Sequence, residues 1–147
     1  MGRAPASVLF ACSRNAIRSP IAEAIAKHLL ARRVFVDSAG VRPGPLDPFA
    51  VAVLEEIGID LQRHRPKSFD DLQDGSFDLI VSLSPEAHHK AMEMTRTSAC
   101  EVEYWPTPDP SAVEGGRETV LEGYRALRDQ LMAKIKRRFD MSGGPTV

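Results

Sequence analysis

The sequence predicts an α/β fold, a three-layer sandwich in which a four-stranded parallel sheet carries helices on both faces. Short apolar runs alternate along the chain with segments of helical periodicity, and these runs are almost continuously apolar, as in strands buried on both faces. The length of 147 residues fits one domain, 1–147, with an ordered core at about 7–139 and tails at 1–6 and 141–147. In such sheets, ligands bind beyond the carboxyl ends of the strands.

The first strand and the first helix are expected near the start of the chain. The segment SVLFAC, residues 7–12, is short, apolar and rich in strand formers. A helix is predicted to begin at Ser19 and Pro20, since proline suits the first turn of a helix. Its buried stripe is expected to contain Ile21, Ile25, His28 and Leu29.

Three further strands and three further helices follow in alternation. The strands are predicted at 34–38, 77–83 and 100–105. One helix begins at Asp47 and Pro48 and is stopped by Gly58, and a second runs from Pro85 to about Met94. The last helix is marked by a buried stripe of Val120, Tyr124, Leu127, Leu131 and Ile135.

The composition argues against several classes of partner. The 19 lysines and arginines nearly balance the 20 aspartates and glutamates, so we expect no nucleic-acid or membrane-surface partner. No apolar stretch approaches the roughly 18 residues of a membrane span, and residues 1–7 lack the apolar segment of a secretory signal. A cytoplasmic protein is therefore expected, in which Cys12 and Cys100 each need their own explanation.

The loop after the first strand is the candidate site. Backbone N–H groups of Ser13, Arg14, Asn15, Ala16 and Ile17 would point inward at the positive end of the following helix and bind a phosphate-like or sulfate-like anion. Arg18 could grip two phosphate oxygens at once. The same groups favour the thiolate of Cys12, which is a nucleophile.

Asn15 and Ser19 also have predicted roles in this segment. Asn15 tolerates left-handed backbone, which a tight loop requires. The hydroxyl of Ser19 either donates to the sulfur of Cys12 or caps the helix, and the pattern does not separate the two. A buried cysteine at a strand end is more often structural than catalytic, so it is the conjunction of strand, loop, arginine and Ser-Pro that favours chemistry.

Several segments resemble the low-molecular-weight protein tyrosine phosphatases, whose fold is shared with thiol-dependent arsenate reductases of the thioredoxin type. The similar segments are VLFACSRNAIRSPIAEA (8–24), DSAG (37–40), DPFAVAVLEEIGIDLQRHR (47–65), FDLIVSL (77–83) and PTPDPS (106–111). Their order and spacing match, so the resemblance covers almost the whole domain. It implies a phosphocysteine intermediate, no metal and no other cofactor.

The resemblance also implies roles for individual residues. Cys12 is the nucleophile, Arg18 binds the phosphate, and Asp109 is first the general acid and then the base. Proline on both sides of Asp109, including Pro110, restricts the backbone that carries it. Asn15, Ser38 and His64 would hold the loop by hydrogen bonds, whereas His64 without the resemblance would be taken for an exposed residue of a basic run.

The sequence also departs from this family. Arginine stands at position 14, where glycine is most frequent, and the segments after SAG and after Asp109-Pro110 lack the aromatic residues that stack on phosphotyrosine. The expected substrate is therefore a phosphorylated protein or a small aryl phosphate. The protein is expected to be a monomer or a weak dimer. An arsenate reductase that uses an external thiol remains an alternative, because residues 67–99 contain no relay cysteine. The second alternative is a non-catalytic module that only binds phosphate.

Overall fold

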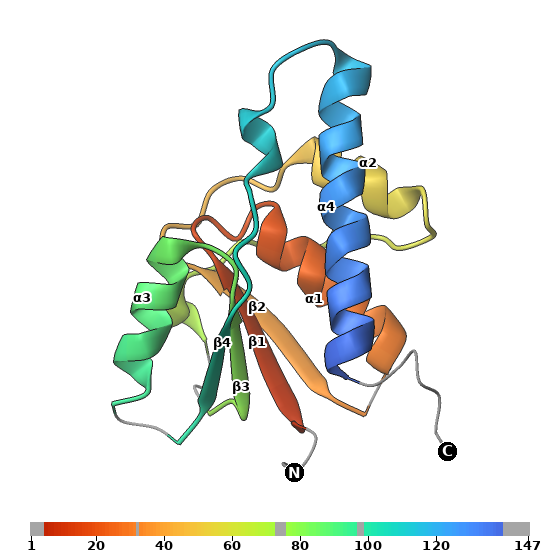
Figure 1. Cartoon of the computed structure of the whole chain (residues 1–147). Helices are drawn as coiled ribbons and strands as arrows, with labels where there is room; N and C mark the ends of the chain where they lie inside the picture. The colour runs from red at the N-terminus through yellow and green to blue at the C-terminus, as the bar shows by residue number, and fades with distance from the viewer. Residues whose placement is uncertain (1–4, 32, 73–75, 97–98, 140–147) are drawn as a thin grey trace.

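Four parallel strands form a single sheet in the order β2-β1-β3-β4 (Figure 1). The computed structural model describes residues 5–31, 33–72, 76–96 and 99–139. The strands are β1 (Ser7–Cys12), β2 (Phe35–Gly40), β3 (Leu79–Ser82) and β4 (Glu101–Tyr104). The helices are α1 (Arg18–Leu30), α2 (Pro48–Glu55), α3 (Pro85–Met94) and α4 (Arg117–Arg138), with short 3-10 turns η1 (Phe69–Asp71) and η2 (Pro110–Ala112). The predicted parallel sheet of four strands is confirmed.

The helices cover both faces of the sheet, as the three-layer prediction requires (Figure 1). On one face α1, α2 and α4 pack over Val8, Phe10 and Cys12 of β1. On the other face α3 and η1 pack over Leu9 and Ala11. Alternate residues of β1 thus enter different cores, because successive side chains of a strand point to opposite faces. Both faces are apolar, which explains why the strand reads as a continuous apolar run.

The boundaries of the elements differ from the predictions at several ends. β1 and α3 agree, while β2 extends to Gly40 and β3 and β4 are shorter than predicted. The predicted burial of His28 is wrong, because this side chain is exposed. α1 packs against β1, β2 and α4 and buries a wider stripe, which includes Ala22, Ala26 and Leu30. Small alanine side chains allow close packing, and periodicity of large apolar residues alone did not reveal them.

The ends of the chain lie mostly outside the described residues, including 1–4 and 140–147, where most of the predicted tails fall. The Ala6 carbonyl, just before β1, accepts a hydrogen bond of 2.9 Å from the Phe35 N–H at the start of β2. None of the described helices is long and apolar enough to cross a membrane.

The strand order places the carboxyl end of β1 at a topological switch point. β1 lies between β2 and β3, so the connections that leave neighbouring strands run to opposite sides of the sheet. Open α/β sheets bind ligands in the crevice that this divergence creates. Cys12 is the last residue of β1 and therefore lies at the base of that crevice.

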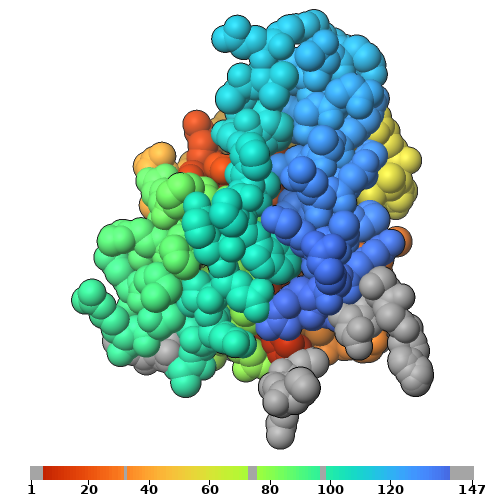
Figure 2. Space-filling view, in the orientation of Figure 1, coloured from red at the N-terminus to blue at the C-terminus, as the bar shows by residue number. Residues whose placement is uncertain are grey.

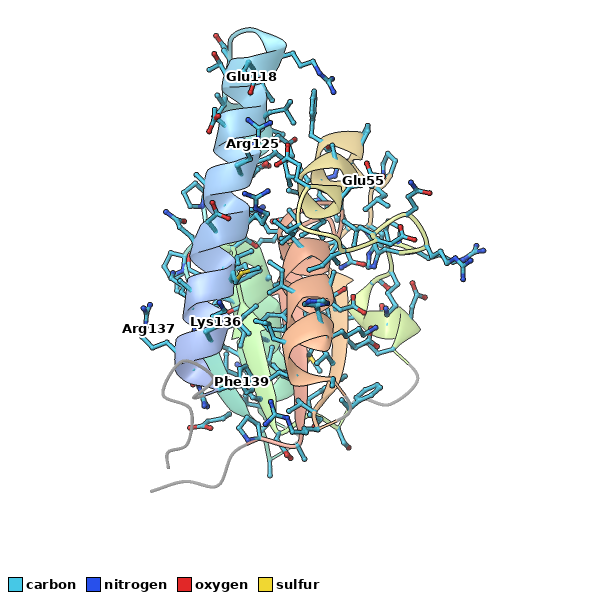
Figure 3. The ribbon with its side chains drawn as sticks, turned by 90° about the vertical axis from the view of Figure 1, so that its right-hand side faces the viewer. Glu55, Glu118, Arg125, Lys136, Arg137 and Phe139 are labelled. Carbon is cyan, nitrogen blue, oxygen red and sulfur yellow. The ribbon has the colours of Figure 1, made fainter. Side chains whose placement is uncertain are left out.

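An ion-pair cluster joins α2 to α4 near this crevice. Figure 3 shows α2 beside α4, with Arg125 on the side of α4 that faces α2. Arg125 and Arg128 both contact the Glu56 carboxylate, at 2.8 Å, and Arg128 also donates to the Val53 carbonyl at 2.9 Å. Hydrogen bonds from Arg125 and then Arg128 lower the pKa of Glu56 to about 2, although burial opposes them. The cluster holds α2 against α4.

We expect Glu56→Gln to destabilise the protein in a pH-dependent way. A carboxyl group whose pKa falls from 4.5 to about 2 on folding adds stability that is fully present above pH 4.5 and is lost as pH falls toward 2. The difference in urea midpoint between wild type and Glu56→Gln should therefore be largest at neutral pH and shrink steadily from pH 5 to pH 3. Glu55→Gln, the neighbouring exposed position, is the matched control. A difference independent of pH would contradict the assignment.

Candidate active site

The loop after β1 is held open by backbone hydrogen bonds from the segment after β2. Four backbone N–H groups of that segment donate to carbonyl oxygens at the end of β1 and in the loop. The pairs are Val41 to Cys12 at 3.2 Å, Arg42 to Ser13 at 2.8 Å, Gly44 to Arg14 at 2.9 Å and Asp47 to Ala16 at 3.2 Å. The N–H groups of Ser13, Arg14, Ala16 and Ile17 donate to none of the residues that the structure describes. The outward carbonyls leave these four amides without a partner among the described residues, whereas the Asn15 N–H, which was also predicted to bind the anion, donates to the Cys12 sulfur at 3.3 Å.

The close approach of β2 to this loop requires glycine at its end. A Cβ atom on Gly40 would lie 2.7 Å from the backbone of Arg14 and Asn15, so any side chain there would push the loop away. In Figure 2 the red atoms that follow β1 reach the surface between the orange segment after β2 and the teal segment after β4. The loop is thus exposed at its mouth while its back is packed on the sheet.

The sulfur of Cys12 receives several polar contacts although its residue is only 2% exposed. The Asn15 N–H and the Ser19 N–H donate to it at 3.3 and 3.4 Å, and the Ser19 hydroxyl lies 2.9 Å away. The hydroxyl proton is free to point at the sulfur, since the same oxygen already accepts from Asn15 Nδ2 at 2.8 Å. Ser19 does not cap α1. The structure therefore decides between the two predicted roles of Ser19 in favour of the sulfur.

The side chain of Asn15 joins the loop to the rest of the domain. Asn15 has a φ of 54°, the left-handed conformation predicted for it, and is fully buried. Its Nδ2 donates to the hydroxyls of Ser19 and Ser38, at 2.8 and 2.9 Å. Its Oδ1 accepts from His64 Nε2 at 3.0 Å and from the Lys67 N–H at 2.9 Å. The predicted hydrogen bonds to Ser38 and His64 are present.

A buried carboxylate that the sequence analysis missed, Glu23, completes this network. Its Oε1 accepts from the Ser38 hydroxyl at 2.5 Å, and its Oε2 pairs with Lys27 at 2.6 Å. His64 Nδ1 lies 3.6 Å from Oε1. Glu23 is four residues after Ser19 on the buried side of α1, and an acidic residue on a buried helical stripe is the signal that would have revealed it.

His64 is buried rather than exposed, with a side chain only 8% accessible. Burial is the main cause of a lowered pKa for His64, while the Glu23 carboxylate and the hydrogen bond to Asn15 oppose this shift. Because Asn15 Oδ1 needs a donor, Nε2 carries the proton. The ring therefore acts as a hydrogen-bond donor that orients Asn15.

Arg18 and Asp109 approach the loop from different elements. Arg18 is the first residue of α1, and its Nη1 donates to the Thr107 carbonyl at 2.9 Å, two residues before Asp109. Asp109 is exposed and caps η2, where its Oδ1 accepts from the N–H and the hydroxyl of Ser111 at 2.9 and 2.7 Å. Its Oδ2 is left without a hydrogen bond to the described residues, so this oxygen can carry a proton.

These residues meet at a cavity of about 240 Å³. Its lining comprises Cys12, Arg14, Ala16, Ile17, Arg18, Pro45, Asp47, Asp109 and Ser111. None of these lining residues is aromatic, in agreement with the absence of aromatic walls noted in the sequence. Phe49 packs instead against Tyr124, with ring centroids 5.4 Å apart, and Trp105 packs against Phe10 at 6.1 Å. The cavity is therefore walled by charged and aliphatic groups.

The other predicted residues lie behind or beside this cavity. Asn15 in the loop and Ser19 in α1 are fully buried. Pro110, the first residue of η2, is buried as well. Ser13 turns away, and its hydroxyl donates to the Ser84 hydroxyl at 3.0 Å. The part of the chain described here contains no group of three or more His, Cys, Asp or Glu that could hold a metal ion.

Asp47, which no motif had indicated, forms part of the cavity wall. It caps α2 by accepting from the Phe49 N–H at 2.7 Å, and its other oxygen accepts from the Tyr124 hydroxyl at 2.8 Å. Burial, followed by the contact with Asp47, raises the pKa of Tyr124. Tyr124 therefore stays protonated and fixes the Asp47 carboxylate, which ties α4 to the mouth of the site.

The left-handed backbone at residue 15 can be tested by two substitutions. We expect both Asn15→Gly and Asn15→Ala to destabilise the protein, and Asn15→Ala to be less stable than Asn15→Gly by about 1 kcal/mol, because only alanine meets the left-handed steric penalty. Urea unfolding measures the difference. Ala24, within α1, is the control position. There the Ala24→Gly variant should be less stable than the wild-type protein by about 1 kcal/mol. Equal stability of the two Asn15 variants would contradict the assigned conformation.

The chain is similar to known proteins over most of its length. The family described as low molecular weight phosphotyrosine protein phosphatase matches residues 7–139. An arsenate reductase of Bacillus licheniformis is 32% identical over 89% of this chain and 93% of its own length, and a glutaredoxin arsenate reductase of Synechocystis is 29% identical over 88% and 92%. A low molecular weight protein tyrosine phosphatase from T. tengcongensis superposes with a TM-score of 0.74, at 27% identity over 92% of this chain and 98% of its own.

A match over residues 7–139 takes in every element from β1 to α4. The chain belongs to the low molecular weight phosphotyrosine protein phosphatase family.

Proposed function

We propose that this protein is a cysteine-dependent phosphatase that hydrolyses phosphomonoesters through a phosphocysteine intermediate. One observation carries the proposal: the sulfur of Cys12 accepts from two backbone amides and can accept from one hydroxyl beneath a loop whose remaining amides are unoccupied. Such a ring of donors stabilises a thiolate and an incoming dianion alike. A cysteine with only a packing role has no need of it.

The first chemical step transfers the phosphoryl group to sulfur. The Cys12 thiolate attacks phosphorus, an S–P bond forms, and the bond from phosphorus to the leaving oxygen breaks. Arg18 and the loop amides hold the three equatorial oxygens as charge develops on them. Asp109 gives its proton to the leaving oxygen, and Oδ2 is the oxygen available for it because Ser111 occupies Oδ1.

The second step returns the enzyme to its starting state. Asp109, now ionised, takes a proton from water, the oxygen of that water attacks phosphorus, and the S–P bond breaks. The Ser19 hydroxyl, 2.9 Å from the sulfur, stabilises the departing thiolate. Phosphate leaves, and Asp109 is again protonated for the next cycle.

The size and lining of the cavity favour a small or slender leaving group. About 240 Å³ is below the roughly 300–1,000 Å³ typical of sites for drug-sized ligands. A phosphoryl group and the first ring of an aryl ester, either phosphotyrosine of a protein or a small aryl phosphate, are the substrates we propose. The aliphatic and charged wall does not require stacking on an aromatic ring.

Arsenate reduction is the second candidate, because the relatives from Bacillus licheniformis and Synechocystis are named arsenate reductases. The thiolate that attacks phosphate could attack arsenate as well, but turnover then needs a further thiol. The sequence contains only one other cysteine, Cys100, which packs against the opposite face of the sheet from Cys12. A reductase of this sequence would therefore depend on an external thiol, and arsenate-dependent oxidation of glutathione or mycothiol would reveal it.

We expect Asp109→Asn to affect substrates according to the acidity of their leaving alcohol. Hydrolysis of phenyl phosphate should fall about 10²-fold or more, because phenol must be protonated as it leaves. Hydrolysis of 2,4-dinitrophenyl phosphate should fall much less, since that leaving group needs no proton. Steady-state kcat/KM for the two esters provides the measurement. Equal losses on both esters would count against Asp109 as the acid.

Cys12→Ser separates an enzyme from a module that only binds phosphate. The variant should lose hydrolysis of aryl phosphates while it still binds inorganic phosphate, because the loop amides and Arg18 remain. Phosphate release and calorimetry measure the two properties. Cys100→Ser is the matched control and should hydrolyse normally. Wild-type protein that binds phosphate but hydrolyses no aryl ester between pH 5 and pH 8 would favour the module.

A further inference from the structure

Arg14 differs from the other cations around the mouth of the site because its guanidinium has no hydrogen-bond or ion-pair partner among the described residues. Arg42 pairs with Glu86, Lys67 pairs with Asp37 at 2.7 Å, and Arg18 donates to the Thr107 carbonyl. Arg14 is exposed, lines the cavity together with Cys12, and forms no ion pair with any residue in the described ranges. Its guanidinium is therefore available to a ligand.

The position of that guanidinium is set by Gly44. A Cβ atom on Gly44 would lie 2.6 Å from Nε and Nη2 of Arg14, so the guanidinium rests directly on the glycine backbone. The backbone contact between Gly44 N–H and Arg14 carbonyl, 2.9 Å, brings the two residues together. Arg14 thus lies along one wall of the cavity beside Pro45.

Two carboxylates also line the cavity. Asp109 and Asp47 both line the cavity, and Asp47 is held by Tyr124 and by the Phe49 N–H. A second anionic group on a substrate would be repelled by the Asp47 carboxylate. The lining contains two cations, Arg14 and Arg18. Arg18 is engaged with the Thr107 carbonyl and, in the proposed reaction, with the phosphoryl group, so Arg14 is the cation that can accept a second anionic group.

We infer that Arg14 is a specificity-determining residue that binds a carboxylate of the substrate next to the scissile phosphoryl group. The planar fork of arginine matches a carboxylate in a bidentate manner. The inference rests on the proposed function, because it concerns the substrate that the phosphatase prefers. Acidic phosphosubstrates, whether a phosphopeptide with a neighbouring Asp or Glu or a small carboxyaryl phosphate, share this chemistry.

Matched pairs of substrates test the inference. Phenyl phosphates that carry a carboxylate at ring position 2, 3 or 4 are compared with the corresponding carboxamides, which have nearly the same shape without the charge. We expect wild type to favour at least one carboxylate over its carboxamide about fivefold in kcat/KM, mainly through KM, as for a solvent-exposed ion pair. Arg14→Met should abolish this preference.

Two further variants separate a direct contact from a general effect of charge. Gly44→Ala keeps the charge of Arg14 but displaces its guanidinium, and it should reduce the preference for the carboxylate. Arg42→Met removes a positive charge from the same edge of the site and should keep the wild-type preference. A preference that survives in Arg14→Met, or that falls equally in Arg42→Met, overturns the inference.

Failure of the inference is distinguishable from failure of the proposed function. The matching carboxyphenyl and carbamoylphenyl phosphonates cannot be hydrolysed, so calorimetry compares their binding to wild type and Arg14→Met without turnover. Tighter binding of the carboxylate by wild type alone supports Arg14 even if no phosphate ester is hydrolysed. Equal binding of both phosphonates overturns the role of Arg14 even if hydrolysis is fast.

Discussion

The hydrogen bonds of Asn15 are the interaction on which the candidate site depends. This one amide donates to Ser19 and Ser38 and accepts from His64 and the Lys67 backbone. Because both hydroxyls accept from it, their own protons must point elsewhere: that of Ser19 to the Cys12 sulfur and that of Ser38 to Glu23. A single buried side chain thus orients the hydroxyl that faces the Cys12 sulfur.

The network behind the loop also explains why a charged residue is buried in α1. An isolated buried carboxylate costs several kcal/mol, but Glu23 is satisfied by the Ser38 hydroxyl and by Lys27. Removal of the Asn15 side chain would deprive the buried Ser19 and Ser38 hydroxyls of their amide donor. The loop is therefore rigid before an anion arrives, and its amides need no rearrangement at the moment of reaction.

The site divides into a part for chemistry and a part for recognition. The loop floor contains Cys12 and the inward amides, and the chain is similar both to proteins named tyrosine phosphatases and to proteins named arsenate reductases. The wall is built from other elements: Asp47 from the cap of α2, Asp109 from η2, and Arg14 on the outer side of the loop. Changes in the wall can alter the substrate without disturbing the sulfur.

The sequence alone determined the class of the fold, the position of the candidate nucleophile Cys12, and the identity of most residues that surround it. These properties are local: a strand that ends in cysteine, a loop of five residues and a helix that begins beside arginine place the groups in one segment. The left-handed conformation of Asn15 followed from its residue type for the same reason.

Only the tertiary structure decided which distant groups complete the site. Glu23 acquires its role because β2 brings Ser38 to it, and the choice of the Ser19 hydroxyl between sulfur and helix cap depends on what Asn15 donates to. The exposure of His28 and the burial of His64 likewise depend on neighbours far along the chain. Long-range packing sets the burial of a side chain, and local periodicity carries no record of which elements will pack against it.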